Sequence, residues 1–310
     1  MTQSHAICTL FEGDYHYGLG ALVNSAFQCG YRGTVWAGYR GPLPPWARQA
    51  QKHGPYSELK VDDAIRIRFV PLESEVHFTN YKPHFMLDVL NTFAPDIEAL
   101  FYFDPDITLK AGWAFFEEWV RCGVALCEDF NSPWNPTHPL RLRWKEFFAP
   151  HGVLLNSTHS LFVNGGFVAL TRQNQAFLEE WLRNLELIKP HADDLRRLCL
   201  GERTLLFQVP DQDALNVTMY STKTTVSMLG QEGMDFIPGG YTMSHAAGGE
   251  KPWRKRLLAS ALGGYPPSSA DKGYWRHVEH PIRLYTPGQL LPKRIELRIA
   301  AAVGRMLRRS

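Results

Sequence analysis

The sequence predicts an α/β protein with a mostly parallel central sheet and helices on both faces of that sheet. Up to about residue 130, short β-rich runs alternate with longer helical periods, a pattern that is typical of successive parallel strands. The chain has 310 residues, enough for one large α/β domain with additions or for two average domains. Apolar residues make up 45% of the chain and charged residues 21%, which excludes a disordered, collagen-like or disulfide-stapled protein.

The individual elements follow from apolar runs and from the glycines and prolines that end them. We expect strands over residues 6–11, 34–39, 65–70, 97–103 and 123–127, and regular structure again over residues 160–170. We expect helices over residues 17–29, 80–93, 111–121 and 173–187, with Gly30 as the C-terminal cap of the first. Residues 129–159 contain Trp134 and Trp144 but little periodicity, which predicts a functional loop or lid.

Charge and cysteine content restrict the partners and the compartment. The 33 Lys and Arg against 31 Asp and Glu give a net charge of +2, too even for a nucleic-acid groove. The cysteines are odd in number and form no C-x-x-C pair, so we expect reduced thiols at Cys8, Cys29, Cys122, Cys127 and Cys199. The sequence has no run of 18 apolar residues and no signal-peptide layout at its start. We therefore expect a cytoplasmic protein, with peripheral attachment to the cytosolic face of a membrane as the alternative.

The last residues predict a basic amphipathic helix. From Pro292 onward the chain has six Lys and Arg against one Glu. An apolar stripe recurs at helical spacing: Ile295, Ile299, Ala302 and Met306. Such a helix can bind an anionic membrane surface. The alternative is a terminal helix that packs on the domain by its apolar face and leaves its arginines in solvent.

Two D-x-D pairs are candidates for binding a hard cation. Asp104 and Asp106 directly follow an apolar strand, and open α/β sheets bind their ligands at the carboxyl ends of strands. Two carboxylates on a turn there can both reach one cation. Asp211 and Asp213 form the second pair. The alternative for either pair is an acidic, solvated turn.

The N-terminal strand ends in a turn that can hold a nucleotide. Residues 9–11 end the strand, and Tyr15 and Tyr17 follow before the helix, where an aromatic ring can stack on a base. The turn is not a G-x-G-x-x-G fingerprint, so dinucleotide binding is disfavoured.

A late segment combines a histidine, glycines and a lysine. His245 is followed by Gly248, which allows close backbone approach, and by Lys251, a point charge suited to phosphate. A histidine, two aspartates and a lysine together fit a metal–diphosphate. Taken alone, His245 is more often a hydrogen-bonded surface residue than a ligand.

Together these motifs resemble the family 8 glycosyltransferases, the group of glycogenin and bacterial lipooligosaccharide galactosyltransferases. They occur in family order from Thr9 to Trp253, about four fifths of the chain. The matching residues are Thr9-Leu10, Asp14, Tyr17, Gly20-Ala21-Leu22-Val23, Asp104-x-Asp106, Asn164-Gly165-Gly166, Asp211-Gln212-Asp213-Ala214-Leu215-Asn216 and His245-x-x-Gly248-x-x-Lys251-Pro252-Trp253. The sequence departs from the family at Pro105, at the double glycine after Asn164, and by one extra residue between Asp14 and Tyr17.

The resemblance implies a GT-A fold, a Rossmann-like fold that binds nucleotide diphosphate sugars, and assigns roles to residues. It implies that Asp104, Asp106 and His245 hold a divalent cation; two carboxylates and an imidazole suit Mn²⁺ better than Mg²⁺. The implied donor-binding residues are Thr9, Leu10, Tyr17, Lys82, Pro105, Asn164, Gly165, Gly248 and Lys251. Asp211 and Gln212 would lie beneath the anomeric carbon of the donor sugar.

The implied function is a metal-dependent, retaining transfer of a hexose from a nucleotide sugar, UDP-hexose, to a saccharide or glycoconjugate acceptor, as in lipopolysaccharide or polysaccharide biosynthesis. Retention is inherited from the family. We expect Trp134 or Trp144 to stack on the acceptor. One rival is a sugar-1-phosphate nucleotidyltransferase, although residues 11–20 lack the Arg or Lys that its loop requires. The other is a non-catalytic sugar-nucleotide-binding or envelope-assembly subunit.

The corresponding domain prediction is a catalytic domain over residues 1–260 and a C-terminal extension over residues 261–310 that carries the basic helix. Within the catalytic domain, residues 1–128 would bind the nucleotide, residues 129–160 would form the acceptor loop, and residues 161–260 would bind the sugar and the acceptor.

Overall fold

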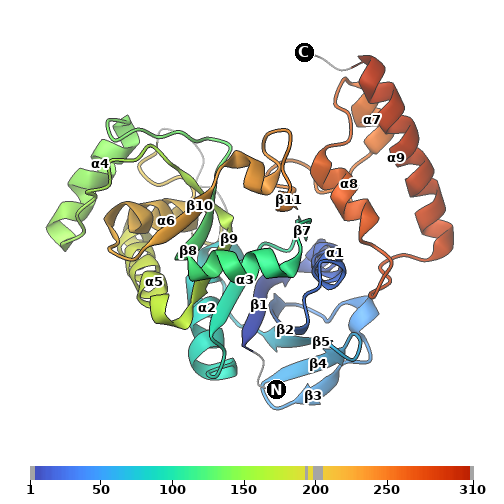
Figure 1. The fold of residues 1–310 in the computed structure, drawn as a ribbon, viewed down its shortest axis with the longest axis horizontal. Helices are drawn as coiled ribbons and strands as arrows, with labels where there is room; N and C mark the ends of the chain where they lie inside the picture. Colours follow the sequence, from blue (N-terminus) through green and yellow to red (C-terminus); the bar gives the residue numbers. More distant parts are fainter. Residues whose placement is uncertain (1–3, 193–194, 198–204, 308–310) are drawn as a thin grey trace.

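In the computed structural model, a large sheet lies between two layers of helices, and three further helices form a separate group beside them (Figure 1). The structure describes residues 4–192, 195–197 and 205–307. Within these residues the large sheet contains β1 (His5–Glu12), β2 (Gly33–Arg40), β3 (Gln51–His53), β4 (Tyr56–Lys60), β5 (Ile65–Pro71), β6 (Ala99–Phe103), β8 (Val124–Glu128), β9 (Val163–Thr171) and β10 (Val226–Leu229), and a small sheet contains β7 (Ile107–Leu109) and β11 (Met243–His245). The helices are α1 (His16–Gln28), α2 (Lys82–Asp88), α3 (Trp113–Arg121), α4 (Pro139–Phe148), α5 (Ala176–Ile188), α6 (Pro210–Ser221), α7 (Leu257–Leu262), α8 (Ser269–Arg276) and α9 (Pro287–Leu307).

The strand order of the large sheet is β10-β8-β9-β6-β1-β2-β5-β4-β3. Strands β6, β1, β2 and β5 are parallel neighbours at its centre. Strand β9 is antiparallel to both β6 and β8, and β4 is antiparallel to both β5 and β3. Since β10 is parallel to β8, all strands of this sheet in the described residues except β9 and β4 run in one direction. The predicted mostly parallel α/β fold is confirmed.

Side chains along the central strands alternate between two cores, as the period of two in a strand requires. Ala6, Cys8 and Leu10 of β1 pack in the core that α2, α5 and α6 cover. Ile7 and Phe11 point into the opposite core, which α1 and α3 cover. The strand is fully buried because helices cover both faces, which explains why its sequence is a continuous apolar run.

The prediction of a loop over residues 129–159 is wrong, because α4 occupies the middle of this segment. Pro139 stands in the first turn of α4, and the His138 ring accepts a hydrogen bond from the Leu140 backbone. The buried face of the helix consists of Arg141, Trp144 and Phe148. The arginine in that face hides the apolar period, which is why the sequence pattern missed the helix.

Two further differences concern segments whose sequence pattern is weak. The helix expected over residues 80–93 is divided into a short 3₁₀ turn (Phe78–Tyr81), α2 and a π-helical turn (Val89–Phe93). Arg172 donates hydrogen bonds to the Leu90 and Ala94 carbonyls around that last turn. The β3–β4 hairpin was not expected, since β3 is exposed throughout and has no apolar alternation.

The three C-terminal helices pack on α1 around their own small core, which includes Ala21, Leu257, Tyr274 and Trp275. Asn24 of α1 anchors them: its amide donates to the His277 and Ile282 carbonyls and accepts from the Ile282 backbone. In Figure 1 these helices stand apart from the central sheet and α9 runs along their outer side.

No helix in the described part of the chain combines the length and the apolarity needed to cross a bilayer. Cys8, Cys29, Cys122 and Cys127 are free thiols, as expected for these four, and Cys199 lies outside the described residues.

Candidate active site

A cavity of about 310 Å³ opens at the carboxyl ends of β1 and β6. In open α/β sheets, ligands bind at this edge because the loops that follow the strands converge there. Most of the site residues expected from the sequence line it: Leu10, Lys82, Asp104, Pro105, Asp106, Asn164, Asp211, Gln212, His245, Gly248 and Lys251. They come from segments that are far apart in the chain, so the fold assembles them.

The small β7–β11 sheet brings the histidine to the D-x-D turn. Asp104 and Asp106 lie between β6 and β7, and the antiparallel register pairs His245 with Ile107. His245 Nε2 lies 3.3 Å from Asp106 Oδ1 and 3.8 Å from Asp104 Oδ2. Ligand atoms of the three side chains all lie within 4.8 Å of one another.

This donor set fits a divalent cation. Two carboxylates and one imidazole are common ligands of such ions, and all three side chains line the cavity, where a bound ligand could supply further oxygens. The approach of the histidine depends on Gly166 of β9, because a Cβ there would lie 2.4 Å from His245 Cε1. The second glycine of the pair noted in the sequence is therefore a steric requirement of this site.

Two lysines balance the charge of the cluster. Lys251 Nζ lies 2.7 Å from Asp106 Oδ2 and also donates to the Ala246 carbonyl. Burial alone would raise the pKa of Asp106, but His245 and Lys251 outweigh burial and hold that pKa below its usual range. Asp106 is thus an anion, as a metal ligand must be.

Lys82 links the D-x-D turn to α6. It is 2% exposed, and its Nζ lies 3.2 Å from Asp104 Oδ1 and 3.3 Å from Asp211 Oδ2. It also donates to the Gly165 carbonyl at 2.9 Å. Burial would lower the pKa of Lys82, but Asp104 and Asp211 raise it, so the buried lysine stays charged.

Asp211, in the first turn of α6, is a buried carboxylate that faces the cavity. It is 1% exposed, and neither of its oxygens has a hydrogen-bond partner among the described residues; Lys82 holds it by charge. Burial raises its pKa to about 6, although Lys82 opposes this rise. Unpaired buried carboxylate oxygens are costly, and hydroxyl groups of a ligand would satisfy them.

Sequence analysis missed Asp129, which organises the opposite wall. Its carboxylate is buried and accepts hydrogen bonds from Asn164 Nδ2 at 2.6 Å and Gln212 Nε2 at 3.3 Å. Gln212 in turn accepts from the Gly165 backbone. Asp129 therefore orients the two amide side chains of the cavity. Its place directly after β8, at the same edge as Asp104, was the available signal.

Three of the expected donor-binding residues do not line the cavity. Thr9 lies within β1 and is fully buried, and Gly165 packs against the Lys82–Asp211 ion pair. The prediction for Tyr17 is wrong: its ring stacks on Tyr285, at 5.2 Å between ring centroids, and does not line the cavity. Tyr15 takes its place as the aromatic of the cavity, because the short 3₁₀ turn at Gly13–Tyr15 precedes α1.

The two tryptophans that we expected to contact the acceptor instead pack against other side chains of the protein. Trp144 is 1% exposed, and its indole N–H donates to the Leu206 carbonyl. Trp134 stacks against both His138 and Phe162, with centroids 4.1 and 4.2 Å away. Neither residue lines the cavity, because α4 turns this segment into a packed layer.

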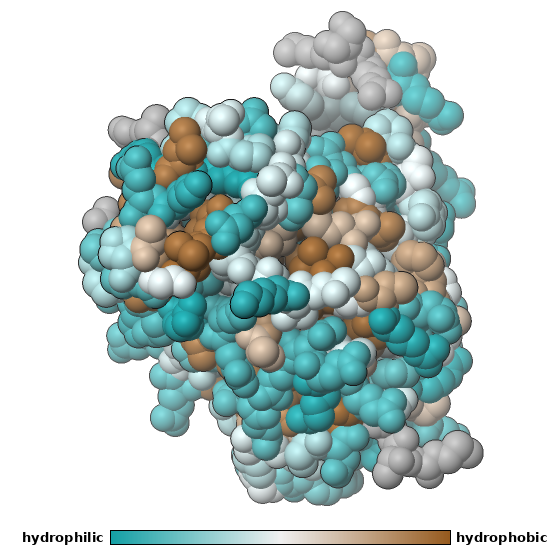
Figure 2. Space-filling view, turned by 60° about the vertical axis from the view of Figure 1, so that its left-hand side comes forward, coloured by the Kyte–Doolittle hydropathy of each residue, from teal (hydrophilic) through white to brown (hydrophobic). Residues whose placement is uncertain are grey.

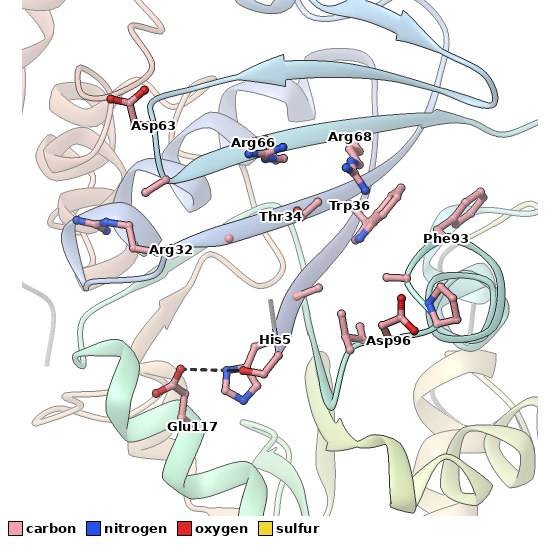
Figure 3. Close-up of a pocket in the computed structure, with 17 residues that line it drawn as sticks. His5, Arg32, Thr34, Trp36, Asp63, Arg66, Arg68, Phe93, Asp96 and Glu117 are labelled. Carbon is pink, nitrogen blue, oxygen red and sulfur yellow. Dashed lines mark hydrogen bonds and ion pairs between the residues drawn. The ribbon is translucent and has the colours of Figure 1, made fainter. Parts of the chain in front are cut away.

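A wider hollow, of about 920 Å³, lies at the opposite end of the sheet (Figure 3). Several of its charged or titratable side chains have partners inside the protein: Arg68 pairs with Glu58 at 2.8 Å, and His5 with Glu117 at 3.0 Å. Arg32 donates to two backbone carbonyls. We therefore assign the candidate site to the smaller cavity.

Comparison with known proteins identifies the fold. No protein-family model matches the sequence, and no curated protein matches it. Among solved structures, the chain is similar to WbbM, a bifunctional glycosyltransferase in its apo form, with a TM-score of 0.55 and 14% identity over 95% of this chain. The chain spans about half of that protein's length, 52%. The fold is the mixed α/β GT-A type, with its large, mostly parallel sheet.

Proposed function

We propose that this GT-A chain is a metal-dependent glycosyltransferase that moves a hexose from a nucleotide diphosphate sugar, UDP-hexose, to a saccharide or glycoconjugate acceptor. One observation carries the proposal: a carboxylate–imidazole cluster and an unsatisfied buried carboxylate, Asp211, share one cavity. The cluster suits a cation–diphosphate, and the carboxylate suits the hydroxyl groups of a sugar.

In this proposal Asp104, Asp106 and His245 hold Mn²⁺, with Mg²⁺ as the alternative. When bound, the cation would stabilise the negative charge that develops on the leaving nucleoside diphosphate. Lys251, beside Gly248, would contact a phosphate oxygen. Because Lys251 now pairs with Asp106, binding of the donor would exchange this contact for one with phosphate.

The nucleoside would lie against the wall of the cavity at the end of β1. Leu10, Pro105 and the Tyr15 ring line this wall, which offers apolar and aromatic surface to a base and ribose. Gly18 supports the wall: a Cβ there would lie 2.4 Å from the Pro105 carbonyl oxygen, so the helix can pack directly on the D-x-D turn.

The donor sugar would lie between Asn164 and the first turn of α6. Asp211 would accept hydrogen bonds from its hydroxyls, and Gln212, held by Asp129, would orient the anomeric carbon. We propose retention by a front-face route. Its support is that the Asp129 carboxylate already accepts four hydrogen bonds and that Asp211 forms an ion pair with Lys82, so neither carboxylate is poised as a nucleophile.

The proposed domain organisation remains a catalytic domain over residues 1–260 and an extension over residues 261–310. The separate core of α7, α8 and α9 supports this division. The core includes Leu257, four residues before the proposed boundary.

Release of UDP from UDP-glucose and UDP-galactose tests the reaction. We expect slow release without an acceptor, dependent on Mn²⁺ and abolished by a chelator. Binding of UDP with Mn²⁺ but no release under any condition would instead favour the non-catalytic binding subunit. Pyrophosphate release from UTP and a hexose 1-phosphate would favour the nucleotidyltransferase.

We also propose that α9 binds an anionic membrane surface. The helix packs inward through Leu290, Ala300 and Gly304, so the expected apolar stripe faces solvent. Ile295 is 50% exposed and Met306 77%. The residues on the same exposed side are Leu291, Arg294, Ile295, Arg298, Ile299, Ala302, Arg305 and Met306. Arg308 and Arg309 lie outside the described residues.

Sedimentation with vesicles tests this contact. We expect binding to phosphatidylglycerol vesicles, loss of binding at high salt, and weak binding to phosphatidylcholine, since each basic residue contributes about 1 kcal/mol near an anionic surface. Ile295→Ser with Ile299→Ser should weaken binding. The matched control is Leu154→Ser, an exposed leucine of the main body. Equal binding by all variants would contradict the proposal.

A further inference from the structure

Phe130 is an exposed aromatic side chain at the mouth of the cavity. Its side chain is 51% exposed although it lines the cavity beside the buried Asp129. Exposed apolar residues that adjoin a polar cavity often mark a binding surface. Figure 2 shows that hydrophobic residues are exposed near the middle of one face, within a surface that is elsewhere mostly hydrophilic.

The turn that carries Phe130 is fixed on both sides of the ring. The Ser132 backbone donates to the Asp129 carbonyl at 3.0 Å, and the Asn131 backbone donates to the Asp129 carboxylate at 2.8 Å. Gln231 donates to the carbonyls of Asp129 and Ser132, both at 3.1 Å. The exposed ring is therefore displayed by an ordered turn, which lowers the entropy lost when a ligand binds to it.

The neighbours of Phe130 connect it to the two halves of the proposed donor site. Its ring meets Phe236 edge to face at 5.5 Å, and Phe236 lies 5.9 Å from the His245 ring. On its other side Phe130 follows Asp129, which holds Asn164 and Gln212. Phe130 is thus connected through Phe236 to His245 and through Asp129 to the amides assigned to the sugar, and the bond to be broken would lie between these groups.

We propose that Phe130 is the platform on which the acceptor, a saccharide, stacks one pyranose face. This inference rests on the proposed function and adds the acceptor side of the same site. Axial C–H groups give one face of a pyranose an apolar surface that an aromatic ring can cover, while the hydroxyls at its edge stay free to react or to bind polar groups. The platform is held open by the Asp129 turn, so it is available before the acceptor arrives.

Two variants separate this role from packing and from donor binding. Phe130→Ala removes the ring, and Phe130→Tyr keeps it. The matched control is Tyr241→Ala, which removes another aromatic ring, 56% exposed, that does not line the cavity. Each variant is titrated with UDP and Mn²⁺ by calorimetry. It is then titrated, with UDP and Mn²⁺ bound, with methyl β-glucopyranoside, methyl β-galactopyranoside and lactose by saturation-transfer NMR.

We expect Phe130→Ala to weaken the tightest-binding of these sugars by about 3- to 10-fold and to leave UDP affinity within about twofold. Phe130→Tyr and Tyr241→Ala should bind the sugar as the wild type does. Unchanged sugar affinity in Phe130→Ala, a matching loss of UDP affinity, or no sugar binding by the wild type would each overturn the platform. A wild type that neither binds UDP with Mn²⁺ nor releases it from UDP-hexose would overturn the proposed function, and the platform with it.

Discussion

The two hollows at opposite ends of the sheet differ in how their charged groups are satisfied. The hollow at the amino ends of β1, β2 and β5 is about three times larger, yet its arginines already contact Glu58 or backbone carbonyls. The cavity at the carboxyl ends is smaller, but three carboxylates converge there and Asp211 has no hydrogen-bond partner among the described residues.

This difference teaches that buried polar atoms without hydrogen bonds mark a site better than volume does. Lys82 balances the charge of Asp211, but the carboxylate oxygens still lack hydrogen bonds, and a ligand could supply them. Paired side chains such as Arg68 and Glu58 gain little from a ligand, because binding would first break their existing contacts. Four substitutions test the comparison, from the largest expected effect to the smallest.

Asp106→Asn should remove activity almost entirely, by about 100-fold or more, because the amide is a weaker cation ligand than the carboxylate. UDP release from UDP-hexose with Mn²⁺ measures the effect. The control is Asp63→Asn at the edge of the amino-end hollow, where Asp63 pairs only with Lys60 among the described contacts. Activity near that of wild type in Asp106→Asn would contradict the metal assignment.

Gly166→Ala should lower activity by about 10- to 100-fold while the protein stays folded. The added Cβ would lie 2.4 Å from the His245 ring and would push it away from the D-x-D turn. A rise in the Mn²⁺ concentration needed for half-maximal turnover measures this displacement. Gly112→Ala is the control, since a Cβ there meets nothing within 4 Å. If Gly166→Ala needs no more Mn²⁺ than the control, then the ring does not bind the cation.

Gln212→Ala should lower kcat by about 10-fold and leave UDP affinity unchanged, because the proposal assigns Gln212 to the donor sugar and not to the nucleotide. The mutation also removes a donor from Asp129, so Asn164 loses part of its support. Steady-state kinetics with parallel UDP titration separates the two quantities. An equal loss of turnover and UDP affinity would move Gln212 out of the sugar site.

Arg66→Ala in the amino-end hollow should have the smallest effect. Arg66 is exposed and lies 3.8 Å from Glu58, a distance typical of a weak ion pair. We expect a change in unfolding free energy within about 0.5 kcal/mol and unchanged turnover. Denaturant unfolding and UDP release measure both. A large loss of turnover would break the comparison, because it would connect the amino-end hollow to the reaction.

Local sequence patterns were sufficient for much of the central sheet and for the place of the D-x-D pair. The apolar runs of β1, β2 and β6 are continuous because helices bury both of their faces, so these runs alone identified the strands. The acidic pair after β6 was predicted to face a ligand because that end of a parallel strand opens to the loops, and Asp104 and Asp106 do line the cavity.

Segments whose burial depends on distant partners were not predictable in the same way. The periodicity of α4 is hidden by Arg141, whose guanidinium is buried because it donates to the carbonyls of Trp134, Ser157 and His159. Tyr15 and Tyr17 are both plausible base-stacking residues in the sequence. Only the packing of α1 against the C-terminal helices turned Tyr17 towards Tyr285 and left Tyr15 in the cavity.

The sequence by itself determined much of the parallel α/β core and which chemical groups are present: a D-x-D turn, a late histidine and a basic terminal helix. Tertiary structure alone decided which groups meet, because a residue's neighbours across the fold are not encoded by local period. It placed Asp129 where its carboxylate accepts hydrogen bonds from Asn164 and Gln212, and it buried Trp144. It also decided which of two apolar rows of α9 packs inward: Leu290, Ala300 and Gly304 fit against the small C-terminal core, so Ile295 and Ile299 remain on the surface.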